Sequence, residues 1–457
     1  MTTPRVIVAG GGIAGLTCAY TVEAEAARLG RQVDVLVIDA GHEAGGHART
    51  VADAGWVMER GPNGFLDSEP ETMALVDELG LSPHLVEANA EARRRFVLRG
   101  GTLVQVPDAP PALLGSSIIS WPAKLRLLRE PWAKPAPPDA DETVFEFAER
   151  RLGREVAEVL VDTAVAGISA GDSRLLSVRS HFPFLVEWER NHGGLLRAVL
   201  ARRKTAPRRP RLLSFAGGLG TLPRTLADRL ASRVMTGRAI TNVARQAQAW
   251  HVQLAGGLSL MADQVVLATP ASQTSAILRQ LDCELASELA AIPYAGLAVV
   301  ALGYAAASLP RNLDGYGYLV ARSEQLATIG VLWESSIFPG RAPDGAVLLR
   351  VFLGGARRPD VAGLDESTLT TLARTELVMG LGIADRPIRH QVFRWPAAIA
   401  QYTVGHDDRV AVIRKRLASH PGLELCGTAC DGVSFNHAIA AARRTARSVA
   451  TRLLGEA

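Results

Sequence analysis

The feature that most constrains this chain is a glycine-rich turn between an apolar run and a helical stretch near the N-terminus. Arg5 to Ala9 is rich in β-branched residues, as in a fully buried strand, and helical spacing continues from Ile13 to Leu29. The turn between them reads Gly10-Gly11-Gly12-Ile13-Ala14-Gly15. In such a turn the first glycine permits a tight bend, the second lets a pyrophosphate approach the backbone, and the third lets helix and strand pack closely. The helix N-terminus then offers free N–H groups to the phosphates.

A second strand supports this interpretation, since a GxGxxG pattern alone is weak evidence. Gln32 to Ile38 predicts a buried strand that ends at Asp39, with Ala40 beside it. A carboxylate at this strand end accepts hydrogen bonds from an adenosine ribose. The alternative is a glycine-rich turn in an ordinary α/β unit. The order of strand, turn, helix and acid favours a dinucleotide site.

The residues after Asp39 indicate which dinucleotide is bound. Gly45-Gly46-His47-Ala48-Arg49-Thr50 resembles the GG-x-x-R-[ST] element of the FAD-containing amine oxidase superfamily, and NAD-binding Rossmann domains do not carry this element. The resemblance implies that Arg49 approaches the FAD diphosphate and balances its charge. The alternative is a surface arginine on a turn.

Composition narrows the class of protein. The chain has 457 residues, 48% hydrophobic and 21% charged, which is enough for a large core in two or three structural units. No apolar run reaches the ~18 residues that a membrane span needs, and we expect no signal peptide before the first strand. The four cysteines match neither a disulfide framework nor a zinc motif, so we expect no metal and a cytoplasmic location. No basic stripe interleaved with aromatic residues indicates nucleic acid.

The stretch from Trp56 to Phe65 resembles the E-x-G-P-x-[SG]-F segment of the protoporphyrinogen and coproporphyrinogen oxidases. Further segments resemble the same family in the same chain order: Arg95–Leu103, Ala166–Asp172, His181–Glu187, Phe215–Pro223, Gly315–Val320, Trp333–Pro339, Gln401–His406 and Gly432–Asn436. Because the resemblance runs nearly end to end, the chain is identified as a member of this FAD-dependent family.

The resemblance implies an α/β fold in which a Rossmann-like FAD-binding domain is interleaved with a strand-rich substrate domain and an inserted helical domain. The FAD-binding domain would comprise residues 1–80, 210–275 and 395–457. The helical domain would comprise residues 85–200, and the substrate domain residues 275–395.

The same resemblance implies two sets of site residues. FAD would contact Gly10, Gly11, Gly12, Ile13, Ala14, Gly15, Asp39, Ala40, His47, Arg49, Gly61, Pro62, Asn63, Gly64, Val243, Thr269, Thr428, Val433, Ser434 and Phe435. The substrate would contact Arg95, Gly317, Leu319, Leu332 and Phe352, with Arg95 holding a propionate. No dedicated acid–base side chain is expected, and Asn63 is the candidate for the catalytic face. The alternatives are a solvated charge run at Arg93 to Arg95 and ordinary sheet core for the apolar residues.

The expected reaction transfers hydride from a porphyrinogen to flavin, with O2 as acceptor and hydrogen peroxide as product. Three rounds complete the six-electron oxidation, and protoporphyrinogen IX is preferred over coproporphyrinogen III.

An amine oxidase is a weaker alternative, because those enzymes usually place a lysine near the flavin and no lysine occurs between Lys204 and Lys415. A carotenoid-type desaturase and a non-enzymatic porphyrin-binding flavoprotein also stay open, as does a homodimer.

One apolar segment suggests a surface role. Trp121, Leu125, Leu127 and Leu128 lie within the segment expected to be helical and would form a lipid-facing patch. This patch would give peripheral contact with the inner face of the membrane. The alternative is that the same residues are ordinary core.

Overall fold

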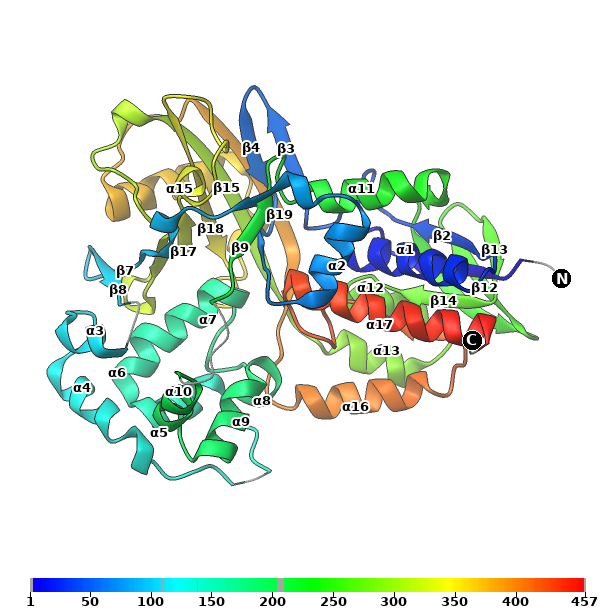
Figure 1. Ribbon diagram of the computed structural model, residues 1–457, viewed down its shortest axis with the longest axis horizontal. Coiled ribbons are helices and arrows are strands. Elements are labelled where there is room, and N and C mark those ends of the chain that lie inside the picture. The colour runs from blue at the N-terminus through cyan, green and yellow to red at the C-terminus, as the bar shows by residue number, and fades with distance from the viewer. Residues whose placement is uncertain (1–2, 108–109, 138, 204–208, 456–457) are drawn as a thin grey trace.

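One half of the protein is a parallel sheet between layers of helices (Figure 1). The computed structural model describes residues 3–107, 110–137, 139–203 and 209–455. Its five-stranded sheet has the order β10-β2-β1-β14-β20. The strands are β10 (Val234–Met235), β2 (Asp34–Ile38), β1 (Arg5–Ala9), β14 (Gln264–Leu267) and β20 (Leu423–Leu425). Residues Val6 to Ala9 of β1 and Val265 to Leu267 of β14 are apolar and buried, because both faces of the sheet are covered.

Helices from opposite ends of the chain cover one face of this sheet. Helix α1 (Ile13–Arg28) and the C-terminal helix α17 (Phe435–Leu454) share a buried cluster that contains Val6, Leu16 and Ile439. Figure 1 shows the two helices side by side, α1 in blue and α17 in red. Helix α2 (Pro70–Glu78) and helix α11 (Thr221–Leu230) complete this layer. The first strand, first helix and second strand predicted from the sequence are confirmed.

The opposite face packs on a second cluster, built around Trp250 and Leu278. It is covered by a three-stranded sheet, β11 (Ile240–Gln246), β12 (Ala249–Leu254) and β13 (Ser259–Ala262). Helices α12 (Ala271–Leu278), α13 (Cys283–Ala290) and α16 (His406–Leu417) lie on the same side. Two small sheets join the halves: β3 (Thr50–Asp53) with β4 (Trp56–Glu59), and β5 (Phe65–Leu66) with β9 (Leu212–Phe215) and β6 (Leu85–Glu87). The predicted α/β class is therefore confirmed.

The second half is built on a seven-stranded mixed sheet of order β19-β15-β18-β17-β16-β7-β8. The strands are β19 (Arg389–Ala400), β15 (Tyr294–Ala305), β18 (Ala346–Gly354), β17 (Thr328–Leu332), β16 (Gly317–Val320), β7 (Arg95–Arg99) and β8 (Thr102–Val106). Helix α15 (Glu366–Leu381) covers one face, where Tyr318, Val331 and Val351 are buried. The other face is the candidate substrate face described below.

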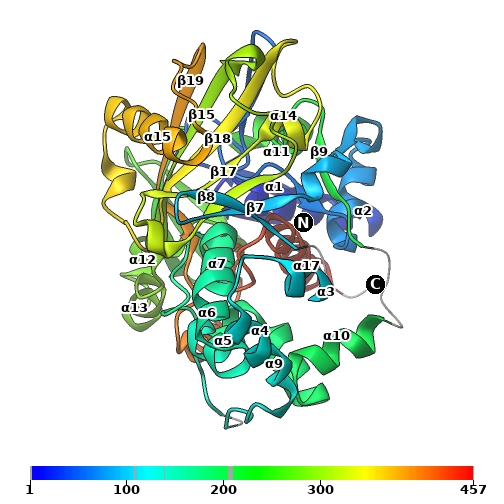
Figure 2. The same cartoon turned by 90° about the vertical axis from the view of Figure 1, so that its left-hand side faces the viewer.

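A group of helices lies beneath the edge of this sheet (Figure 2). The helices are α3 (Pro110–Gly115), α4 (Trp121–Leu128), α5 (Val144–Leu152), α6 (Arg154–Val156), α7 (Asp162–Ser169), α8 (Val178–His181), α9 (Pro183–His192) and α10 (Leu195–Arg203). A π-helical turn, Ala157–Val161, joins α6 to α7. The sequence-based division into FAD, helical and substrate domains stays a prediction. Hairpin β7–β8 lies within the segment assigned to the helical domain and pairs with the seven-stranded sheet.

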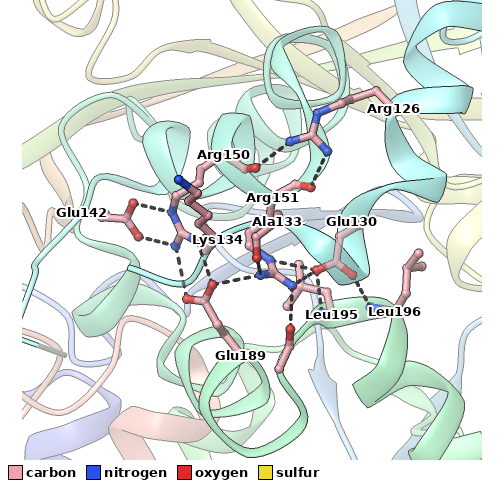
Figure 3. A network of polar contacts seen from close by, with 11 residues as sticks. Arg126, Glu130, Ala133, Lys134, Glu142, Arg150, Arg151, Glu189, Leu195 and Leu196 are labelled. Carbon is pink, nitrogen blue, oxygen red and sulfur yellow. Dashed lines mark hydrogen bonds and ion pairs between the residues drawn. The ribbon is translucent and has the colours of Figure 1, made fainter. Parts of the chain in front are cut away.

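A buried charge network holds this helical group together (Figure 3). The guanidinium of Arg151 donates to Glu130 and to Glu189, and the Arg151 and Glu130 side chains are 0% exposed. Glu130 also accepts hydrogen bonds from the backbone N–H groups of Leu195 and Leu196 at the start of α10. Removing one partner from such a pair costs about 3–5 kcal/mol, because it leaves an uncompensated charge in the interior. The network therefore fixes the turn Glu130–Trp132 against α5 and α10.

The predicted apolar patch is exposed in part. The exposed fractions are 67% for Trp121, 60% for Leu125 and 55% for Leu128. The prediction for Leu127 is wrong, because this side chain packs against a buried cluster that contains Ile118 and Val159. Trp132, which the sequence analysis missed, is 76% exposed and follows the same helix. Among the described residues, no helix is both long and apolar enough to cross a bilayer.

Candidate active site

The glycine-rich turn lies at the carboxyl end of β1, where α1 begins. Gly12 is the N-cap of α1, and no side chain caps the free N–H groups that follow it. The second glycine pair packs directly on this turn: Gly45 N–H donates to the Gly11 carbonyl over 2.7 Å, and Gly12 forms a bridge with Gly45. The two motifs that suggested FAD in the sequence therefore form one surface, with the positive end of a helix dipole behind it.

Glycine is needed at different positions of this turn for different physical reasons. A Cβ atom on Gly15 would lie 1.9 Å from the Gly10 carbonyl oxygen, and one on Gly10 would lie 2.8 Å from the Ala268 carbonyl oxygen. These two glycines are required by packing within the protein. A Cβ on Gly12 would meet no atom nearer than the Gly46 Cα, at 3.9 Å. The protein's own packing therefore leaves room at Gly12, as close approach of a pyrophosphate requires.

Asp39 stands at the end of β2 as predicted, beside the turn. Its carboxylate accepts hydrogen bonds from the N–H groups of Gly11 (2.5 Å) and Gly41 (2.7 Å). Ala40 is exposed next to it. The acid is thus fixed at the edge of the glycine turn, where a ribose would lie if the pyrophosphate is at Gly12.

Arg49 and His47 come from the loop that carries the second glycine pair. Arg49 Nε donates to the Gly46 carbonyl over 3.1 Å, and its guanidinium lies 3.4 Å from Glu43. His47 packs edge-on against Trp395, and burial lowers its pKa, with a further contribution from the nearby Arg49 charge. Arg49 is half-buried beside the turn, and its predicted contact with the FAD diphosphate stays a prediction.

The remaining predicted cofactor residues come from three distant segments. Thr269 follows β14, and its methyl group would lie 3.3 Å from a Cβ on Gly10. The Thr428 carbonyl accepts from the Tyr402 hydroxyl, which also accepts from Gly432 N–H. Ser434 caps α17, with Val433 before it and Phe435 as the first helical residue. Val243 is fully buried on β11, and its predicted backbone contact with the adenine stays a prediction.

The loop from Gly61 to Gly64 connects the cofactor motifs to the large sheet. A Cβ on Gly61 would lie 2.5 Å from the His47 carbonyl, so the loop presses against the second glycine element. On the other side, the Gly61 carbonyl accepts a hydrogen bond from Arg350 on β18 over 2.6 Å. Pro62, Asn63 and Gly64 follow, and Asn63 is 8% exposed.

All five predicted substrate residues lie on one face of the seven-stranded sheet. Strand pairing aligns Arg95, Gly317, Leu332 and Arg350 in one row across β7, β16, β17 and β18. The next row contains Leu319, Gly330 and Phe352. Because directly paired residues point to the same face and side chains alternate along each strand, both rows share the face opposite α15. Leu319 contacts Gly167 of α7, where a Cβ would lie 2.6 Å from a Leu319 methyl carbon.

The surroundings of Gly317 and Arg95 bear on the roles predicted for these two residues. Gly317 was expected to allow close approach of a ligand, but a Cβ there would lie 2.0 Å from the Val331 carbonyl oxygen. Strand packing alone therefore requires this glycine. Arg95 is exposed, stacks 5.3 Å over the Tyr316 ring and makes no ion pair with a described residue. Its neighbour Arg94 is paired with Asp314 at 2.8 Å, so Arg95 has the guanidinium available for an anion.

The sequence analysis missed a set of buried charges between the loop and the sheet. Arg350 donates to Glu334 over 2.6 Å, and both side chains are buried. Glu59 lies 3.5 Å from Arg341 and accepts hydrogen bonds from Thr50 and from Leu219 N–H. Burial raises the pKa of Glu59 to about 7, against the opposing effect of Arg341. A sequence signal existed, since Arg350 interrupts the apolar strand Ala346–Gly354 and a charge in such a position needs a partner.

The comparisons with known proteins define the class. Residues 13–450 match the family described as flavin containing amine oxidoreductase. Human protoporphyrinogen oxidase is 34% identical, covering 97% of this chain and 98% of the relative. The coproporphyrinogen III oxidase of Bacillus subtilis is 28% identical, covering 94% of each. A solved structure from Exiguobacterium sp. 255-15 is 24% identical with a TM-score of 0.87, covering 99% of this chain and all of that one.

The chain therefore belongs to the flavin containing amine oxidoreductase family. It is a flavin-dependent oxidoreductase whose cofactor is FAD. The residues present fit this cofactor: an uncapped helix N-terminus, space at Gly12, an acid at the strand end and a half-buried arginine. When bound, FAD accepts a hydride equivalent at its isoalloxazine ring. The described residues hold no group of three or more His, Cys, Asp or Glu side chains placed to bind a metal.

The space at Gly12 gives a direct test of the cofactor site. We expect Gly12→Val to abolish FAD retention, because the branched side chain would occupy the position of the pyrophosphate while the protein still folds. FAD absorbance per protein should fall below about a tenth of the wild-type value, and the unfolding temperature of the cofactor-free protein should change by less than about 2 °C.

Gly363→Val is the matched control, since Gly363 is exposed and no atom lies within 4 Å of the position of a Cβ there. This variant should purify yellow with full FAD. Full FAD occupancy in the Gly12→Val protein would contradict the assignment of the turn.

Proposed function

We propose that this protein oxidises a porphyrinogen to a porphyrin, with protoporphyrinogen IX as substrate and O2 as acceptor, in tetrapyrrole biosynthesis. The observation that carries the proposal is the sheet face with Leu319, Leu332 and Phe352 beside Arg95, which has no ion pair to a described residue. This face lies next to the loop that continues from the cofactor motifs. A flat apolar macrocycle with carboxylate arms matches such a face. Relatives that carry the names protoporphyrinogen oxidase and coproporphyrinogen III oxidase support the same substrate class.

In this proposal the chain's own residues bind and orient the substrate. Arg95 pairs with a propionate, because a guanidinium binds a carboxylate through two parallel hydrogen bonds. Leu319, Leu332 and Phe352 contact the macrocycle and exclude water from the reacting carbon. Asn63, on the loop between the cofactor motifs and the sheet, faces the ring. Three successive two-electron steps give the porphyrin and three molecules of hydrogen peroxide.

Coproporphyrinogen III is the second candidate substrate, because a relative that covers 94% of the chain carries that name. It has four propionates where protoporphyrinogen IX has two. Arg95 is the cation identified on the substrate face without an ion pair to a described residue, and Arg94 is engaged by Asp314. This charge count favours the substrate with fewer carboxylates. An amine substrate is disfavoured because no lysine occurs between Lys204 and Lys415.

Anaerobic mixing with each porphyrinogen tests the function. The flavin absorbance near 450 nm should bleach on mixing with protoporphyrinogen IX, and admission of O2 should restore it while porphyrin fluorescence grows. Coproporphyrinogen III should react more slowly. A flavin that stays oxidised with both compounds would contradict the proposal, and one that bleaches with an amine instead would favour an amine oxidase.

Arg95→Ala tests the carboxylate contact. We expect substrate binding to weaken by about 1.5–3 kcal/mol, the range for a hydrogen bond to a charged group, which is roughly a 10- to 150-fold rise in KM. The matched control is Arg94→Ala, since Arg94 is paired with Asp314 at the protein surface. Equal KM values for wild-type and Arg95→Ala enzymes would remove Arg95 from the site.

We further propose that the exposed apolar patch, Trp121, Leu125, Leu128 and Trp132, contacts an anionic membrane surface. Next to it lies a hollow of about 440 Å³ lined by Arg126, Arg129, Trp132 and Ala133. Arginine side chains beside a tryptophan suit the binding of anionic lipid headgroups. Tryptophan suits the boundary between headgroups and acyl chains. The macrocycle of the proposed substrate and product is apolar, so peripheral contact would place the enzyme where they partition.

Sedimentation with vesicles of anionic phospholipid tests this contact. Trp121→Ser combined with Trp132→Ser should weaken binding about 100-fold or more, because each buried tryptophan contributes ~1.5 kcal/mol or more. The control is Met379→Ser with Ile388→Ser, which removes exposed apolar side chains elsewhere. Binding equal to that of the wild type would argue against the membrane contact.

A further inference from the structure

The Asn63 side chain is held in one orientation by its neighbours. Its Nδ2 donates to Glu334 Oε1 over 3.3 Å, and the Asn63 side chain also lowers the pKa of the neighbouring Tyr316 hydroxyl, as a donated N–H does. A carboxylate only accepts hydrogen bonds, so the NH2 group of the amide must face Glu334. The Asn63 Oδ1 then faces away, and it makes no hydrogen bond with any residue in the described part of the chain.

Glu334 is itself fixed from two sides of the domain junction. Arg350 Nε donates to the same Oε1 over 2.6 Å. The Arg350 Nη1 donates to the carbonyls of Glu59 (3.0 Å) and Gly61 (2.6 Å). Arg350 therefore connects the sheet to the loop that carries Asn63, and it presents Glu334 to the amide at a fixed position.

Stability alone does not account for this arrangement. The Glu334 and Arg350 side chains are at most 1% exposed, and Glu334 Oε2 and Arg350 Nη2 have no partner among the described residues. A buried ion pair adds little stability over apolar side chains of similar size, and unsatisfied buried atoms are a cost. The pair is therefore poorly suited to stability and well suited to orienting a third group.

The same amide connects to the predicted carboxylate-binding arginine. Arg95 stacks 5.3 Å over the Tyr316 ring, and Tyr316 meets Asn63 through its hydroxyl. Burial raises the pKa of Tyr316, with a further contribution from Glu334, so the phenol stays neutral. A line of contacts thus runs from Arg95 through Tyr316 and Asn63 to Glu334.

We propose that Glu334, held by Arg350, is a positioning residue that turns the Asn63 carbonyl oxygen toward the substrate, where it accepts a hydrogen bond from a pyrrole N–H. This inference rests on the proposed porphyrinogen oxidation. As a hydride leaves the macrocycle, positive charge develops on the ring and its N–H groups become stronger donors. The Asn63 oxygen then stabilises the transition state more than the ground state, which raises kcat rather than lowering KM. The proton lost with each hydride passes to solvent.

The test is a mutant cycle on kcat in the FAD-loaded enzyme. The Glu334→Leu/Arg350→Met variant replaces the ion pair with apolar side chains, which buried sites often accept without loss of stability. We expect kcat to fall about tenfold or more with KM within about twofold, and Asn63→Ala to give a similar loss. The triple variant should be no slower than Asn63→Ala, because the pair acts through Asn63.

Glu334→Gln is the rescue variant, since its amide oxygen still accepts from Asn63 and Arg350. Its kcat should return to within about threefold of the wild type. The matched control is Glu376→Gln: Glu376 is a buried carboxylate on α15 that accepts from the N–H groups of Ala327 and Thr328 and does not contact Asn63. This control should keep the wild-type kcat.

Three results would overturn the inference while the wild-type enzyme remains active. These are wild-type kcat in the Glu334→Leu/Arg350→Met enzyme, multiplicative losses in the triple variant, and loss of FAD or of the native unfolding temperature in the double variant. The last result would show that the pair maintains the fold and does not act through Asn63. A wild-type protein that oxidises neither porphyrinogen would instead remove the proposed function together with this inference.

Discussion

The junction between the cofactor motifs and the large sheet is organised around one buried guanidinium, which needs polar partners because it lies in an apolar strand. Arg350 lies in the middle of β18, 0% exposed, and an unpaired charge there would cost several kcal/mol. Its partners are Glu334 and the carbonyls of Glu59 and Gly61. Satisfying this one side chain therefore brings the loop after the cofactor motifs onto the sheet face that we assign to the substrate.

The glycine turn imposes the complementary constraint on the cofactor side. Gly10 and Gly15 are needed for the packing of strand and helix, and Gly12 leaves space that the protein does not fill. The loop from Gly61 presses against the His47 carbonyl, so the cofactor motifs and the substrate face share one connecting segment. A hydride transfer needs its donor and acceptor held at a fixed separation, and a junction fastened by buried hydrogen bonds provides that rigidity.

The sequence predicted those parts of the site that depend on local pattern. The strand at Arg5, the helix from Ile13 and the acid at Asp39 follow from periodicity and glycine spacing. The sheet rows could not be predicted, because the pairing of Arg95 with Gly317 joins segments more than 200 residues apart. Arg350 was visible as a charge within an apolar run, but its partners were not.

Surface assignments were the least predictable from the sequence. Leu127 and Leu128 are adjacent in a helix, yet only Leu128 is exposed, since the two point in different directions from the helix axis. Trp132 follows in a proline-containing turn whose position depends on the buried Glu130 and Arg151 pair. Exposure there is a consequence of tertiary packing, which residue type and spacing do not determine.

The most direct test of the central claim is a crystal structure of the FAD-loaded protein with bound porphyrin product. The account predicts that a propionate pairs with Arg95, that the ring lies over Leu319, Leu332 and Phe352, and that Asn63 Oδ1 lies within about 3.2 Å of a pyrrole nitrogen. A porphyrin bound away from this sheet face, or an Asn63 amide whose nitrogen faces the ring, would contradict it.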